Sequence, residues 1–312
     1  MTLPRLLGVG GAHIDRRGQV AGDYVAGASN PGTLREEVGG VVLNALRNAV
    51  QRGVRASLFS VRGGDAAGDT VARAIATAGI EDLSAVFLDR PTPSYTALVE
   101  RGGDLIAGLA DMGLYELAFP KQLSRSKLRD AVAQADAVLC DANLPALAAR
   151  KLATLADGKP IFAIAISPAK VVRFSGMLDA VSCLFMNLRE ARALSGMDQQ
   201  AEPGAIAAAL REQGLRAGVL TAGGRPVTGF DAHGTFSITP PPGNVADETG
   251  AGDALAGATV AGLMAGRGLR EALREGMAAA RLTVESEAAV VDLASRAFAE
   301  ALALVPKAEE VA

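Results

Sequence analysis

Residues 247–254 combine acids with small residues in a pattern that could do chemistry. The run reads Asp247-Glu248-Thr249-Gly250-Ala251-Gly252-Asp253-Ala254. Three small residues at a helix start let backbone N–H groups converge, and the helix dipole favours an anion there. Asp253 falls in the first turn, where a carboxylate can accept a proton from a substrate hydroxyl group. The pattern therefore indicates phosphoryl transfer, the simpler alternative being an acid that only stabilises a helix start.

Two polar side chains nearer the start of the chain could bind a hydroxylated substrate. Asp15 comes just past a predicted strand and Gly10-Gly11, in the region where open α/β sheets bind ligands. Its carboxylate can accept two hydroxyl hydrogen bonds from a sugar. Asn44 lies one turn into a predicted helix that opens with Gly39-Gly40, and its amide can also bind a hydroxyl group. A turn aspartate and a packing glycine pair with a surface asparagine are the plainer interpretations.

Two further patterns suit a nucleotide. Asn187 and Glu190 are three residues apart, so they share a helix face and could hold magnesium-bound water beside phosphates. A helix cap with a first-turn acid has the same spacing. Residues 221–224, Thr221-Ala222-Gly223-Gly224, follow a predicted strand directly and could wrap phosphate groups. For both patterns, the sequence allows either nucleotide binding or a purely structural role.

Other nucleotide and metal motifs are absent from the sequence. No Gly-x-x-x-x-Gly-Lys-Ser/Thr occurs, which excludes a P-loop kinase. Gly8-Val9-Gly10 is followed by His13 where the dinucleotide fingerprint needs a third glycine, which disfavours a Rossmann dehydrogenase. Protein-kinase signatures are missing. His13 and His233 have no nearby carboxylate in the sequence, so a structural or peripheral role is expected, and no zinc site is indicated.

Composition favours a folded protein that handles a small polar metabolite. Of the 312 residues, 49% are hydrophobic but only 4% are aromatic, so aliphatic residues must build the core. The formal net charge is −3 without a basic block, and neither a nucleic-acid nor a membrane surface is indicated. The first apolar run, Leu6 to Gly10, is too short for a signal peptide. With Cys140 and Cys183 expected as buried free thiols, we predict a cytoplasmic protein.

Short apolar strands and helices alternate along the chain and must position these side chains. We expect strands over 6–9, 56–61, 94–100, 105–109, 137–140, 161–166, 184–186 and 217–221. We expect helices over 41–51, 69–78, 123–135, 145–156, 188–194, 206–213, 251–265, 269–287 and 294–304. This alternation predicts an α/β fold with a mostly parallel, helix-covered central sheet. The polar segments 16–38 and 92–110 break the rhythm, and we expect both to form a small antiparallel β-sheet lid.

Taken in order, these patterns resemble those of the ribokinase, or PfkB, family of carbohydrate and nucleoside kinases. Gly39-Gly40 with Asn44 is similar to the first family signature, and Asp247 to Ala254 is similar to the second. The resemblance extends from Gly10 to beyond Asp253. It implies that residues 1–312 form one ribokinase-like kinase domain, with the two lid segments inserted in it. It also implies ATP and Mg²⁺ as cofactors. Because the open edges of a lid sheet can pair between subunits, we expect a homodimer formed through the lid.

The resemblance implies a role for each candidate residue. Asp253 would be the catalytic base, above an anion hole formed by Gly250, Ala251 and Gly252. The substrate would be held by Asp15, His13, Gly39, Gly40 and Asn44. The nucleotide would be bound by Asn187, Glu190, Thr221, Gly223, Gly224 and Thr249, with Asn187 and Glu190 also organising Mg²⁺ through water. Asp247 would be the candidate ligand of a monovalent cation such as K⁺. Because the ordinary pKa of aspartic acid is about 3.9, we expect Asp253 to be ionised at neutral pH.

Within the family, the pattern is most similar to that of pseudouridine kinases. Ser29-Asn30-Pro31-Gly32, Ser94-Tyr95, Ala110-Asp111-Met112 and Asp141-Ala142-Asn143 carry this similarity. They would place Asn30, Tyr95, Asp111 and Asn143 around a nucleoside. The implied reaction is transfer of a phosphoryl group from ATP to the 5′-hydroxyl of a nucleoside, with pseudouridine as the first candidate. Another ribonucleoside or a sugar such as ribose or fructose is the alternative, as is a non-catalytic nucleoside-binding regulator.

Overall fold

A ten-stranded sheet forms the centre of the computed structural model, which describes residues 2–286, 288–293 and 296–311. Seven neighbouring strands are parallel: β13 (Gly218–Thr221), β12 (Cys183–Asn187), β11 (Ile161–Ile164), β10 (Ala137–Asp141), β1 (Arg5–Val9), β4 (Arg55–Phe59) and β6 (Glu81–Asp82). Beyond β13, successive antiparallel pairings add β14 (Val227–Asp231), β15 (Gly234–Ile238) and β16 (Glu309–Val311). The predicted mostly parallel sheet is thus confirmed.

Helices cover both faces of this sheet, because successive residues of a strand point to opposite sides. On β1, Leu6 belongs to one buried apolar cluster and Leu7 to the other. The first cluster is closed by α1 (Val41–Gln51), α2 (Ala66–Thr77), α9 (Ala251–Met264), α10 (Leu269–Val284) and α11 (Arg296–Leu304). The second is closed by α3 (Gly113–Gln122), α4 (Ser126–Gln134), α5 (Ala146–Ala156), α6 (Pro168–Val171), α7 (Leu188–Ser195) and α8 (Pro203–Glu212).

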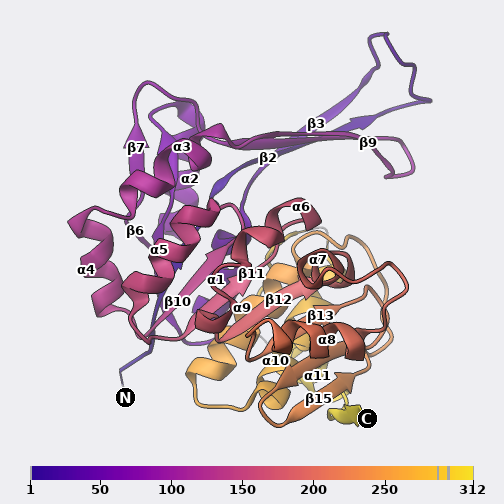
Figure 1. The fold of residues 1–312 in the computed structure, drawn as a ribbon. Coiled ribbons are helices and arrows are strands. Elements are labelled where there is room, and N and C mark those ends of the chain that lie inside the picture. Colours follow the sequence, from indigo (N-terminus) through magenta and orange to yellow (C-terminus); the bar gives the residue numbers. More distant parts are fainter. Residues whose placement is uncertain (1, 287, 294–295, 312) are drawn as a thin grey trace.

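A separate four-stranded sheet projects from the main body (Figure 1). Its order is β3 (Gly32–Gly39), β2 (His13–Val20), β8 (Ser94–Val99) and β9 (Leu105–Asp111). Each of the two predicted lid segments supplies one antiparallel hairpin, β2–β3 and β8–β9. At the centre of the sheet, β2 and β8 pair in parallel and join the two hairpins. We call these four strands the small sheet.

The structure differs from the sequence prediction at several elements. The predicted strand 56–61 divides at Ser60, because Val61–Gly63 (β5) pairs with Ala85–Phe87 (β7) and leaves the main sheet. The sequence pattern missed α3, whose interior contains Pro120, a residue that lacks a backbone donor. It also missed the β14–β15 hairpin. The predicted helix ends at Glu287 and Ala294, and the predicted domain ends at Met1 and Ala312, lie outside the described residues.

Cys140 and Cys183 are free and buried on β10 and β12, as the sequence analysis expects. Burial raises the pKa of both thiol groups, so they pack as apolar side chains. Within the described part of the chain, every helix is too short or too polar to cross a lipid bilayer.

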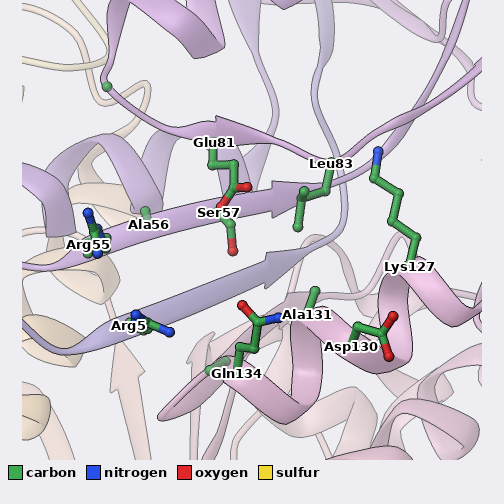
Figure 2. Close-up of a pocket in the computed structure, with 12 residues that line it drawn as sticks. Arg5, Arg55, Ala56, Ser57, Glu81, Leu83, Lys127, Asp130, Ala131 and Gln134 are labelled. Carbon is green, nitrogen blue, oxygen red and sulfur yellow. The ribbon is translucent and has the colours of Figure 1, made fainter.

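A cavity of about 620 Å³ lies at the amino ends of β1 and β4, against α4. Figure 2 shows Arg5, Arg55 and Ser57 on the strands facing Lys127 and Gln134 on α4. The residues that the sequence analysis assigns to a site are absent from its lining. Open α/β sheets bind ligands at the carboxyl ends of their strands. The opposite end of the sheet is therefore where the candidate site belongs.

Candidate active site

Asp253 stands in the first turn of α9, directly after the sharp turn at Gly250. Gly250 has a φ of +80°, which favours glycine, and a Cβ atom there would collide with the carbonyl oxygen of Ala289. The Nδ2 of Asn44 on α1 donates a hydrogen bond to Asp253 Oδ2 at 3.0 Å. The packing of α1 against α9 thus joins the two predicted signatures, which are 209 residues apart in the sequence.

The environment of Asp253 changes its acidity. Burial raises the pKa of Asp253 to about 7, with a further increase from the neighbouring Asp141 and Asp15, while the hydrogen bond from Asn44 opposes the shift. This upward shift of the pKa opposes the expected ionisation of Asp253 at neutral pH. A base with a pKa near the working pH is well matched to accept a proton.

Asp141, at the end of β10, is a fully buried acid that the sequence analysis did not select. It accepts hydrogen bonds from the backbone N–H groups of Gly11 and Asn143, both at 2.9 Å, and from that of Val42 at 3.4 Å. Burial raises its pKa, and these backbone donors oppose the rise. Asp141 thereby joins the ends of β1 and β10 to the start of α1. An acid directly after a buried strand, the signal that selected Asp15, could have identified it.

His13 lies between Asp15 and a tyrosine. Its Nε2 is 3.3 Å from Asp15 Oδ1, and its Nδ1 is 3.1 Å from the hydroxyl group of Tyr115. The expectation that His13 lacks a carboxylate partner is wrong, because alternate residues of β2 point to the same face. Tyr115 comes from α3, which the sequence pattern missed. His13 therefore holds Asp15 against the buried end of the main sheet.

Asn143 also joins this group of side chains. It is 3% exposed, and its Oδ1 accepts a hydrogen bond from Lys170 Nζ at 2.7 Å. Desolvation lowers the pKa of Lys170, while Asp141 opposes that shift. The structure thus brings Asp15, His13, Asn44, Asn143 and Asp253 to the carboxyl ends of the parallel strands.

The other predicted substrate residues lie on the small sheet. Tyr95 is in register with Asp15 across the β2–β8 pair, and Asp111 is opposite Ser94. Asn30 lies in the loop between β2 and β3, which projects away from the main body (Figure 1). Its side chain bonds within that loop, to the backbone of Val25 and Ala28. The structure does not bring Asn30 to the other candidate residues.

A cavity of about 600 Å³ opens beside the start of α9. Four of the residues predicted to bind the nucleotide line it, as do two of the predicted anion hole: Asn187, Thr221, Gly223 and Gly224, with Ala251 and Gly252. The apolar part of its wall is formed by Val227, Val245, Leu255, Met277, Ala280 and Val284. At Gly252 an added Cβ atom would meet nothing within 4 Å. One end of the cavity is bordered by glycines, which let backbone N–H groups approach phosphate groups closely. The rest of the wall is apolar and could pack against a nucleotide base.

Asn187 and Glu190 form a reciprocal cap at the start of α7. The Glu190 N–H donates to Asn187 Oδ1 at 3.0 Å, and the Asn187 N–H donates to Glu190 Oε2 at 2.8 Å. Burial raises the pKa of Glu190. Asn187 also borders the cavity, whereas Glu190 is buried behind it. The helix cap, which the sequence analysis gave as the alternative for this pair, is therefore present. Asn187 serves as that cap and also borders the cavity.

The turn before α9 is held from two sides. Asp247 Oδ1 accepts from the N–H and the hydroxyl group of Thr249, at 2.9 Å and 2.7 Å. Arg17 on β2 donates to Asp247 Oδ2 at 2.8 Å, and these contacts lower the pKa of Asp247 against the effect of burial. The backbone N–H of Ala251 donates to Glu248 within the same turn. The small sheet is thus joined directly to the loop that carries the predicted anion hole.

Known proteins resemble the chain over most of its length. The sequence profile of the pfkB family of carbohydrate kinases matches residues 4–295. The uncharacterized sugar kinase YeiI of Escherichia coli is 29% identical, over 88% of this chain and 76% of that protein. Pseudouridine kinase of the same organism is 28% identical, over 79% of this chain and 80% of that protein.

Solved structures share the whole fold. A carbohydrate kinase from Agrobacterium tumefaciens has a TM-score of 0.88 and 44% identity, covering 99% of this chain and all of that one. Ribokinase from Arabidopsis thaliana, in complex with ribose and ATP, has a TM-score of 0.84 at 20% identity, covering 97% of this chain and 99% of that one. The second likeness concerns the fold alone.

Proposed function

Because the chain belongs to the pfkB family of carbohydrate kinases, we propose that it transfers the γ-phosphoryl group of ATP to the 5′-hydroxyl of a nucleoside. Pseudouridine is the first candidate, and the products would be pseudouridine 5′-phosphate and ADP. One observation carries the proposal. The nucleotide-sized cavity reaches the helix start that bears Asp253, so a phosphate donor and a base would meet at one point.

The residues of the chain have separable tasks in this reaction. Asp15, Asn44 and Asn143 would hold the hydroxylated part of the nucleoside through hydrogen bonds. Asp253 would accept the proton of the 5′-hydroxyl late in the transfer, as the phosphoryl group reaches the oxygen. The N–H groups of Gly250 and Gly252 at the start of α9 would stabilise the negative charge on the phosphoryl group.

The donor set fits ATP with Mg²⁺. The described residues contain no group of three or more acidic, histidine or cysteine side chains arranged to bind a metal ion. Mg²⁺ would be held mainly by phosphate oxygens and water, and Asn187 at the cavity wall, with Glu190 behind it, would organise that water. Bound Mg²⁺ would neutralise charge on the phosphates. A monovalent cation at Asp247 stays a prediction, and it would have to share the carboxylate with Arg17 and Thr249.

The choice of pseudouridine has two supports. One is the sequence resemblance at Asn30, Tyr95, Asp111 and Asn143, and the other is the 28% identical pseudouridine kinase. A different ribonucleoside or a sugar remains the second candidate, because the 29% identical relative is described as a sugar kinase. The retained Asp253 and its glycines argue against a regulator that has lost catalysis.

An ATP-consumption screen tests the proposed function. The purified protein would be offered pseudouridine, uridine, adenosine, ribose and fructose 6-phosphate, each with ATP and Mg²⁺. We expect the highest kcat/KM for pseudouridine, by roughly tenfold over uridine, which has the same size but a different glycosidic bond. Preference for ribose or fructose 6-phosphate would select the sugar-kinase alternative. Turnover of none of the five would favour the regulator.

We also propose a cytoplasmic homodimer that forms through the small sheet. Leu34, Leu105 and Leu109 on β3 and β9 are 63%, 59% and 69% exposed. Exposed leucines on a projecting sheet favour burial against a second copy. Sedimentation equilibrium at micromolar concentration should show a dimer that Leu34→Glu with Leu109→Glu converts to monomer. A wild-type protein that sediments as a monomer would contradict this part of the proposal.

A further inference from the structure

The side-chain amide of Asn44 lies between a cation and the acid of the candidate site. Its Nδ2 donates to Asp253 Oδ2 at 3.0 Å. Its Oδ1 accepts from Arg47 NH1 at 3.3 Å, and residues three apart on a helix share one face. If the amide were turned over, its oxygen would face the carboxylate and its NH₂ group would face the guanidinium. Both neighbours therefore favour the same orientation.

Arg47 is a charged residue whose guanidinium hydrogen-bonds to uncharged groups. It is half-buried on α1, and desolvation lowers the pKa of its guanidinium. Among the described residues no carboxylate forms an ion pair with it, and its side-chain donors go to Asn44 and to the backbone carbonyl of Val38 at 3.1 Å. Burying a charge without an opposite charge is costly. The two hydrogen bonds are the compensation that the structure provides for this buried charge.

The contact with Val38 extends this chain of hydrogen bonds to the small sheet. Val38 is the last residue but one of β3, next to the Gly39-Gly40 pair that opens α1. Gly40 has a φ of +112°, and a Cβ atom there would collide with the carbonyl group of Gly11. The backbone between β3 and α1 is thus closely fitted. Arg47 holds the end of β3 and the amide of Asn44 with the same nitrogen atom.

We propose that Arg47 is a positioning residue, which fixes the amide of Asn44 so that its NH₂ group always faces Asp253. This inference rests on the proposed kinase function for its catalytic meaning, but the geometry stands without it. In the observed orientation the NH₂ group stabilises the carboxylate form of Asp253. With Arg47 removed, the amide could present its oxygen and accept a hydrogen bond from the protonated acid, which favours the protonated form.

The expected sign follows from the groups that shift the pKa of Asp253. Asp141 from β10 and Asp15 from β2 raise its pKa, and Asn44 from α1 is the group that lowers it. His13 on β2 lies against Asp15. Loss of Arg47 would leave the two acids in place and weaken the one opposing hydrogen bond. The pKa of Asp253 should then rise above its wild-type value of about 7, and the base would be ionised only at higher pH.

The test is the pH profile of kcat/KM for Arg47→Met, which removes the donors but keeps an unbranched side chain. We expect its acidic limb to lie about one pH unit above that of the wild type, with activity about fivefold lower at pH 7 and close to the wild-type level at pH 9. Arg47→Lys keeps a charged donor and should restore most of the wild-type profile. Arg73→Met, on the exposed face of α2, removes the same charge elsewhere and should change nothing.

A second readout does not need turnover. The pH dependence of thermal stability, compared between each protein and its Asp253→Asn version, isolates the titration of Asp253. Arg47→Met should move that difference to higher pH. The proposal would be overturned if folded Arg47→Met had the same acidic limb in kcat/KM as the wild type and the same stability difference from its Asp253→Asn version. It would also be overturned if Arg47→Met shifted the pH dependence of stability in a protein that already carries Asp253→Asn. If no substrate is phosphorylated, the stability measurement still decides the role of Arg47.

Discussion

Asp253→Asn is expected to lower kcat by about 10²-fold or more while leaving the protein folded. An amide has nearly the shape of the carboxylate and can still contact Asn44, but it cannot accept the proton of the substrate hydroxyl group. The KM values for ATP and nucleoside should change much less, because the lost interaction belongs to the transfer step. Steady-state kinetics with the best substrate of the screen measure both quantities.

The same substitution should stabilise the protein at alkaline pH. The pKa of Asp253 rises from 3.8 in the unfolded chain to about 7 in the folded one. Between these values the folded state binds more protons than the unfolded state, so the free energy of unfolding falls as pH rises from about 4 to about 7. The amide of the variant does not titrate in this range. Asp253→Asn should therefore be more stable than the wild type at pH 8, by on the order of 1 kcal/mol or more.

Asp130→Asn is the matched control, because Asp130 is an exposed acid on α4 at the far end of the sheet. It should change neither kcat nor the pH dependence of melting. Wild-type turnover by Asp253→Asn would remove this residue from the role of base. Equal melting temperatures of wild type and Asp253→Asn at pH 8 would show that the carboxyl group does not titrate near 7.

Gly252→Val is expected to abolish productive ATP binding without unfolding the protein. The new side chain would enter open space at the border of the cavity, where the phosphates are expected next to Ala251. Gly252 lies within α9, and a helical backbone accepts valine at small cost. We expect kcat/KM for ATP to fall by about 10²-fold or more, with a melting temperature close to that of the wild type. Calorimetric titration with ATP should show the same loss in binding.

Gly250→Ala is the contrasting variant, two residues away. Its φ of +80° disfavours any side chain, and the added methyl group would collide with the backbone of Ala289. We expect it to destabilise the fold by roughly 1–3 kcal/mol, so activity and melting temperature should fall together. If Gly252→Val bound ATP normally, the phosphates would have to lie elsewhere in the cavity.

Local features of the fold could be predicted from the sequence. The helix at 41–51 has the predicted bounds, because a glycine pair before it and an amphipathic pattern within it are properties of neighbouring residues. The start of α9 could be predicted for the same reason. The β14–β15 hairpin and α3 could not, because their own patterns are weak. The hairpin is stabilised by pairing with β13, and α3 by packing against one face of the main sheet.

Local motifs selected Asp15, Asn44 and Asp253 as candidate residues, because each stands in a recognisable run. Only the tertiary structure decided how they act. Packing of α1 on α9 places Asn44 against Asp253, and burial with two neighbouring acids raises the pKa of that acid. The roles of Asp141, Tyr115 and Arg47 could not be predicted from the sequence, because they depend on contacts with Gly11, His13 and Asn44. Sequence spacing determines which groups are present, whereas desolvation and long-range contact determine their charge and orientation.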